Sequence, residues 1–137
     1  MQNNANEMAV FNTAIYVRLS KEDIVAAQSG RESNSITNQK QLILDFLKDK
    51  PEFNIVSIRI DDGYTGTNFD RPAFQRMLND IKAGRINCVV VKDLSRFGRE
   101  YINSGKYIHR LFPVLGVSLI AINDNIDTIT RDESSEF

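Results

Sequence analysis

Two side chains at the end of one apolar stretch could do chemistry together. Arg18 and Ser20 lie two residues apart in the segment YVRLSKED, residues 16–23. Residues i and i+2 of an extended chain point to the same side, so the cation and the hydroxyl can face one ligand. A guanidinium close to a serine also favours its alkoxide form and helps it to act as a nucleophile.

A second pair of arginines follows another apolar stretch. In VKDLSRFGRE, residues 91–100, Arg96 and Arg99 lie about one helical turn apart. Guanidinium groups pair bidentately with phosphate oxygens and stay charged at any useful pH. Three of them around a hydroxyl would stabilise the charge of a phosphoryl-transfer transition state without a metal ion. Spacing alone leaves open the alternative of a surface serine with solvated arginines.

Other common chemistries find little support in the sequence. There is no GxxxxGK loop, and no GxGxxG follows the first apolar stretch, which argues against ATP and dinucleotides. The single histidine, His109, lies in the middle of a predicted helix. One histidine cannot supply a zinc set, and a Ser-His-Asp triad would need it at the strand ends, far from its predicted place. Asp61 and Asp62 precede a glycine, a combination more typical of a turn than of a metal site. We therefore expect neither a metal ion nor a cofactor.

Length and composition indicate one soluble domain. The chain has 137 residues, 42% hydrophobic and 26% charged, and no apolar run approaches the roughly 20 residues of a membrane span. Its polar start, MQNNANEM, is not a signal peptide. The net charge of −1 argues against tight autonomous DNA binding, so a nucleic-acid role must rest on local clusters. The single cysteine, Cys88, is expected in the core; it excludes an internal disulfide and fits a reducing cytoplasm.

Strands and helices are predicted to alternate along the chain. Four apolar stretches predict strands at residues 14–19, 54–60, 88–91 and 117–122. Ser35 is expected to cap a helix that runs to about residue 50. Asp70 is expected to cap a second helix, with Pro72 near its start and Gly84 at its end. A third helix is predicted from about residue 100 to residue 111 or 112, ended by Pro113 and Gly116.

This alternation predicts an α/β fold: a mostly parallel sheet of about four or five strands with helices on both faces. Ligand sites of such sheets gather outside the carboxyl ends of the strands, where Ser20, residues 61–70 and residues 92–99 all fall. The polar stretch 21–34 is unusually long for a connection. It is either a tolerated surface insertion or a mobile loop beside the site. The terminal residues, 1–12 and 124–137, are expected to be loosely held tails.

Four motifs together resemble the catalytic domain of serine recombinases of the resolvase/invertase family, specifically its large, transposon-associated branch. They are YVRLS (16–20), SITNQ (35–39), DDGYTGTNFDRPAF (61–74) and LSRFGRE (94–100), and they occur in the order and spacing of the family. The resemblance covers roughly residues 13–123 and implies a resolvase-like catalytic domain that breaks and rejoins double-stranded DNA.

The resemblance also implies roles for individual residues. Ser20 matches the nucleophile that attacks a DNA phosphodiester, which gives a 5′-phosphoserine linkage and a free 3′-hydroxyl. The arginines matching those that grip the scissile phosphate are Arg18, Arg96 and Arg99. Supporting positions of the site are matched by Tyr16, Gln39, Asp62, Thr65 and Arg71. The alternatives stay open that Tyr16 is mainly a core residue, Gln39 a polar helix residue, and Arg71 a partner at a helix start.

Two positions depart from the pattern of the family. Ser95 stands where the small resolvases carry aspartate, so a carboxylate acid/base role cannot be transferred to it, although Asp93 is nearby. Thr65 replaces a serine that is common in the family, which is a milder change.

The resemblance further implies a larger assembly. In the family, a long helix and DNA-binding domains follow the catalytic domain, and this chain ends at Phe137 before that helix. We therefore expect this chain to be an excised domain that is a monomer or weak dimer. The full-length protein would bind recombination sites as dimers and synapse them as a tetramer, without ATP or metal. The alternative function is a non-catalytic anion- or nucleotide-binding α/β module.

Overall fold

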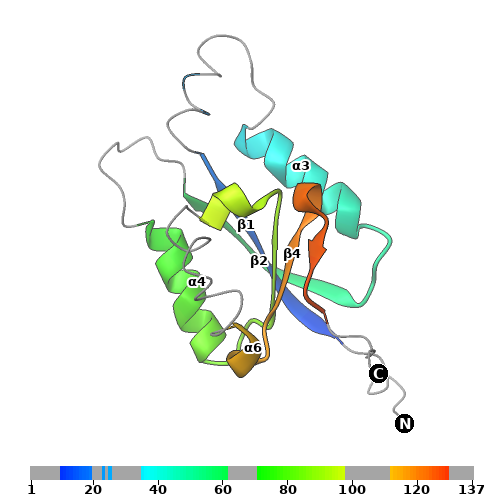
Figure 1. Cartoon of the computed structure of the whole chain (residues 1–137), viewed down its shortest axis with the longest axis vertical. Helices are drawn as coiled ribbons and strands as arrows, with labels where there is room; N and C mark the ends of the chain where they lie inside the picture. The colour runs from blue at the N-terminus through cyan, green and yellow to red at the C-terminus, as the bar shows by residue number, and fades with distance from the viewer. Residues whose placement is uncertain are drawn as a thin grey trace.

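A five-stranded sheet in the order β2-β1-β3-β4-β5 forms the centre of the molecule (Figure 1). The computed structural model describes residues 10–19, 23, 25, 35–61, 71–97 and 112–129. Its strands are β1 (Phe11–Arg18), β2 (Phe53–Asp61), β3 (Cys88–Val91), β4 (Ser118–Ala121) and β5 (Ile126–Asp127). β2, β1, β3 and β4 pair in parallel, and β5 pairs antiparallel with β4. The predicted mostly parallel α/β sheet is therefore confirmed.

Helices cover both faces of this sheet, as predicted (Figure 1). Helix α3 (Ile36–Leu47) packs on one face, and helices α4 (Pro72–Lys82) and α6 (Phe112–Leu115) pack on the other. The central strand β1 serves both layers because its side chains alternate. Ile15 and Val17 are buried with α3, whereas Ala14 and Tyr16 are buried with α4. A strand buried on both faces explains the continuous apolar run in this part of the sequence.

The N-terminal ends of the two long helices are built differently. Ser35 caps α3 as predicted, and its hydroxyl accepts a hydrogen bond of 3.1 Å from the N–H of Asn38. α3 ends at Leu47, about three residues earlier than expected. The prediction that Asp70 caps α4 is wrong, because the N-cap is Arg71 and its side chain makes no capping bond. The carboxylate of Asp61 on β2 accepts from the first-turn N–H groups instead.

Some expected elements differ or lie outside the described residues. Most of the predicted third helix, His109 included, falls in residues 98–111, and residues 21–34 are likewise outside except Asp23 and Val25. Pro113 lies in the first turn of α6, where a missing N–H costs nothing, and Gly116 follows the last residue of this helix. β1 begins at Phe11 and β5 pairs with β4, so both strands reach into segments expected to be tails.

The pairing of β1 with β2 contains one irregularity that sets its register. Thr13 pairs with Ile55, but the next residue, Ala14, pairs with Ser57. Val56 is therefore an extra residue in β2, as in a β-bulge. Beyond it, Tyr16 pairs with Arg59 and Arg18 pairs with Asp61.

Cys88 is fully buried at the start of β3, which confirms its expected place in the core. Burial raises the pKa of its thiol to about 12, so it stays protonated at neutral pH. Among the helices in the described ranges, none combines the length and the apolarity that crossing a membrane requires.

Candidate active site at the ends of strands β1 and β3

The strand order places the point where connections diverge between the carboxyl ends of β1 and β3. The chain leaves β1 for β2 on one side, and β3 lies on the other side of β1. Where successive connections diverge in this way, open α/β sheets bind their ligands. Arg18 is the last residue of β1, and the short 3-10 helix η1 (Leu94–Phe97) follows β3 at the same edge.

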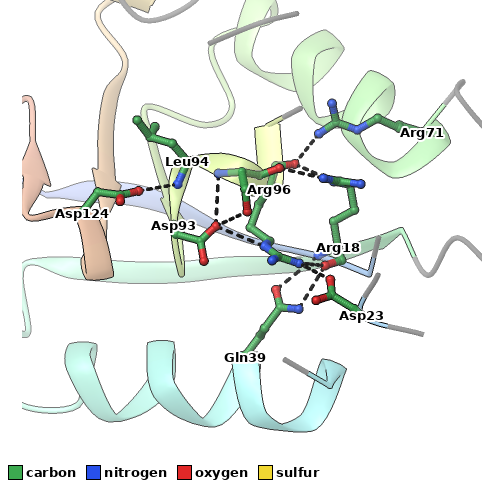
Figure 2. A network of polar contacts seen from close by, with 9 residues as sticks. Arg18, Asp23, Gln39, Arg71, Asp93, Leu94, Arg96 and Asp124 are labelled. Carbon is green, nitrogen blue, oxygen red and sulfur yellow. Dashed lines mark hydrogen bonds and ion pairs between the residues drawn. The ribbon is translucent and has the colours of Figure 1, made fainter. Parts of the chain in front are cut away.

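The guanidinium of Arg18 spans from the end of β1 to η1. Its Nε donates to the carbonyl oxygen of Arg96 at 3.0 Å, and a terminal nitrogen donates to that of Ser95 at 2.7 Å (Figure 2). Burial, followed by the neighbouring charge of Arg71, lowers the pKa of Arg18. Two parallel donors in one plane are the arrangement in which an arginine binds two oxygens of a phosphate.

Arg96 makes the reciprocal contact from η1 back to β1. One terminal nitrogen donates to the carbonyl oxygen of Arg18 and forms an ion pair of 2.7 Å with Asp23 (Figure 2). Its Nε lies 3.3 Å from a carboxylate oxygen of Asp93. The side chains of Arg96 and Asp23 are 6% and 7% exposed, so this ion pair is withdrawn from water. The charge of Arg96 is thus balanced within the protein.

Gln39 fixes the backbone of Arg18 from the α3 side. Its amide nitrogen donates to the carbonyl oxygen of Arg18 at 3.0 Å, and its amide oxygen accepts from the Arg18 N–H at 3.4 Å (Figure 2). The Gln39 side chain is fully buried, although it is polar. A buried amide that is satisfied by one backbone residue is a strong positional constraint. The helix therefore holds the end of β1 in place.

Arg71 enters the site from the start of α4. Its guanidinium donates to the hydroxyl of Tyr16 from two nitrogens, at 3.2 and 3.1 Å, and to the carbonyl oxygen of Arg96 at 2.6 Å. It also lies 4.2 Å from the ring centre of Phe74, within cation–π range. We call Arg18, Arg71 and Arg96 the arginine cluster. The guanidiniums of Arg18 and Arg71 both donate to the carbonyl oxygen of Arg96 in η1, and the guanidinium of Arg96 donates to the carbonyl oxygen of Arg18 (Figure 2).

Tyr16 is both a core residue and a polar contact of the site. Its ring is fully buried and packs edge-on against Phe74 at 5.4 Å, while its hydroxyl donates to Asp61 at 2.7 Å. Burial raises the pKa of this hydroxyl; Arg71 opposes the rise and Asp61 adds to it. The hydroxyl therefore stays protonated and can donate and accept at the same time.

Asp93 and Ser95 shape η1. The hydroxyl and the N–H of Ser95 both donate to one carboxylate oxygen of Asp93, the N–H at 3.1 Å. The N–H of Leu94 donates to Asp124 at 2.7 Å (Figure 2). Ser95 is exposed, and the carboxylate of Asp93 is turned toward it and toward Arg96. The carboxylate of Asp93 thus lies two residues before Ser95, the position at which serine stands in place of an aspartate.

Part of the predicted site can be placed. The structure brings together Tyr16, Arg18, Gln39, Arg71, Ser95 and Arg96. Outside the described residues lie Ser20, Asp62, Thr65 and Arg99. Sequence reasoning missed Asp23 and Asp61, although Asp61 carries a signal in being the last residue of an apolar strand. Within the described ranges, no three His, Cys, Asp or Glu side chains gather as metal ligands would.

Comparisons with known proteins agree on one family. The family model described as "Resolvase, N terminal domain" matches residues 13–137. No curated protein matches the chain. The N-terminal catalytic domain of TP901-1 integrase is 25% identical, with a TM-score of 0.69 over 90% of this chain and 85% of that one. A resolvase family site-specific recombinase from Streptococcus pneumoniae is 29% identical, with a TM-score of 0.68 over 90% and 79%. The C-terminal catalytic domain of ISC1926 TnpA, an IS607-like serine recombinase, shares the fold at 19% identity, a TM-score of 0.60 and coverage of 81% and 69%.

Proposed function

The chain belongs to the resolvase family of serine recombinases, and on that premise we propose that Ser20 attacks phosphodiesters of double-stranded DNA. The oxygen of Ser20 forms a bond to phosphorus, and the bond from phosphorus to the 3′-oxygen breaks. Ser20 loses its proton, the 3′-oxygen leaves as a hydroxyl, and the 5′ end stays attached as a phosphoserine ester.

The observation that supports this proposal most is the arginine cluster. Two of its guanidiniums, those of Arg18 and Arg71, donate to the same carbonyl oxygen, that of Arg96 in η1. Arg18 is also the last residue of the strand that precedes Ser20. Such donors would bind the oxygens of a scissile phosphate and stabilise the charge that develops on them during attack. By likeness to the family, Arg99 adds a further guanidinium, and Asp62 and Thr65 support the site.

The chemistry needs no external energy source. The phosphoserine ester has nearly the bond energy of the phosphodiester from which it forms, so a 3′-hydroxyl from a partner strand can attack it in turn. The same groups then act in reverse, and Ser20 is released. We further propose that the full-length recombinase binds its sites as dimers and joins two of them as a tetramer, so that four strands are cut and exchanged.

The test of this function is a search for covalent protein–DNA adducts. A recombination-competent protein that carries this chain is mixed with a nicked suicide substrate and a chelator, and the products are run on a denaturing gel. Wild-type protein should remain attached to a 5′ end, and Ser20→Ala protein should give no adduct. The matched control is Ser118→Ala, at the amino end of β4, which should behave as wild type.

Two results would count against the proposal. An adduct with Ser20→Ala protein would mean that another side chain is the nucleophile. Loss of the wild-type adduct in chelator would mean that the reaction depends on a metal ion.

A further inference from the structure

Asp61 lies where β1, β2 and α4 meet. It is the last residue of β2 and only 7% exposed. One carboxylate oxygen accepts from the N–H of Ala73 at 2.9 Å, and the other accepts from the N–H of Phe74 at 3.0 Å. The second oxygen also accepts from the hydroxyl of Tyr16 at 2.7 Å. All three hydrogen bonds are buried, so losing this carboxylate would disrupt them away from water.

The start of α4 needs such a partner because its own cap supplies none. Arg71 is the N-cap, with φ of 50° and ψ of 66°, a left-handed conformation that arginine rarely adopts. Residues in such conformations persist when their surroundings hold them. Asp61 bonds the two residues that follow Pro72, and its negative charge lies at the positive end of the helix dipole. The carboxylate therefore fixes the backbone from which the Arg71 side chain leaves.

Asp61 also controls the far end of the Arg71 side chain. The Tyr16 hydroxyl donates its one proton to Asp61 and so turns its lone pairs toward Arg71, which donates to it from two nitrogens. The same guanidinium reaches the carbonyl oxygen of Arg96, to which Arg18 also donates. One carboxylate thus constrains Arg71 at both its backbone and its guanidinium.

We propose that Asp61 is a positioning residue for strand cleavage. It caps α4 and orients the Tyr16 hydroxyl, and thereby holds the arginine cluster where the scissile phosphate binds. This inference rests on the proposed function. Asparagine cannot replace the carboxylate, because its one oxygen cannot serve all three donors and its amide N–H groups would face the N–H groups of α4.

The first experiment uses the chain without DNA and tests the contacts themselves. Hydrogen exchange by NMR should show slow exchange for the N–H groups of Ala73 and Phe74 and for the Nε–H of Arg71. Asp61→Asn should make all three exchange faster. Asp80→Asn is the matched control, since Asp80 lies near the other end of α4 and pairs with Arg59 and Arg85. It should leave the three signals unchanged.

The second experiment measures single-turnover cleavage of the suicide substrate at saturating protein. Asp61→Asn should slow cleavage about 10²-fold, the usual effect of misplacing a reacting group, and leave DNA affinity unchanged. Asp80→Asn should cleave as wild type. Tyr16→Phe should also slow cleavage, and adding Asp61→Asn to it should cost less than Asp61→Asn alone, because both act through Arg71.

The outcomes separate this proposal from the proposed function. If Asp61→Asn loses its exchange protection but cleaves at the wild-type rate, the positioning role is wrong and the recombinase function stands. If wild-type protein forms no adduct at all, both are wrong, whatever the exchange data show. If Asp61→Asn does not fold, Tyr16→Phe decides the matter, and wild-type cleavage by that variant would overturn the proposal.

Discussion

At the scale of single residues, Arg18 contacts two successive carbonyl oxygens with two different nitrogens. We expect Arg18→Ala to reduce the single-turnover cleavage rate on the order of 10²–10³-fold, the usual cost of losing one charge-stabilising donor. Arg18→Lys should recover little, because one ammonium cannot reproduce two donors in a plane. Arg85→Ala serves as control, since that arginine is 71% exposed and pairs with Asp80. Cleavage by Arg18→Lys within about tenfold of wild type would contradict this role.

Arg96 and Asp23 allow a stability prediction at the same scale. Arg96→Met leaves the buried carboxylate of Asp23 without this partner and should lower the free energy of unfolding by about 3–5 kcal/mol. Arg85→Met removes an exposed ion pair and should change the free energy of unfolding far less. Urea denaturation of both variants checks the difference. The double variant Asp23→Asn, Arg96→Met should be more stable than Arg96→Met alone, and equal effects of Arg96→Met and Arg85→Met would refute the argument.

At the scale of secondary structure, local signals predicted the elements better than their ends. The apolar run of β3 and the cap of α3 were found where expected, because both depend on residues close in sequence. The cap of α4 could not be found in this way. Its partner, Asp61, is twelve residues from Ala73, and the two meet because α4 packs against β2. The motif DDG indicates a turn locally, and only tertiary contacts make Asp61 part of the site.

The cap of α3 matters for the site, because this helix carries Gln39, which holds the backbone of Arg18. Ser35→Ala removes the hydroxyl that accepts from Asn38 and should lower the free energy of unfolding by about 1 kcal/mol. Ser35→Asp should keep most of the wild-type stability, because aspartate caps equally well. Urea midpoints of the three proteins provide the measurement. A Ser35→Asp protein that is no more stable than Ser35→Ala would show that the cap does not stabilise α3.

At the scale of the whole molecule, the site joins residues up to 78 positions apart. The sequence predicted that strand ends would carry the site, since this holds for any parallel sheet. It did not predict that β1 lies between β2 and β3, on which the contact of Arg18 with η1 depends. Nor did it predict that Asp23, Asp61 and Asp93 would surround the arginine cluster, because carboxylates in polar segments give no signal of their partners.

The balance of charge leads to a prediction about DNA binding by this chain. Lysine and arginine number 17 against 18 acidic residues, and carboxylates of the protein already contact the arginine cluster. We expect weak binding to duplex DNA without sequence preference, because few phosphates can be neutralised. Gel-shift titrations at physiological salt, with a recombination site and a scrambled duplex, provide the measurement. Site-specific binding at roughly 10⁻⁸ M or tighter would contradict it.

The extra residue in β2, Val56, determines where this strand can lose one residue without disturbing its pairing with β1. Deleting Val56 would let Ile55 and Ser57 oppose Thr13 and Ala14 directly, with every other pair kept. Deleting Ile60 would also remove the bulge, but it would shift the residues between Val56 and Ile60 by one position. Ile58 and Arg59 would each move to the other face of the sheet, which separates Arg59 from Asp80. We expect the first deletion to melt close to wild type and the second well below it, and equal melting temperatures would contradict this. Among natural relatives, a β2 strand one residue shorter should therefore have lost that residue at the bulge, near Val56.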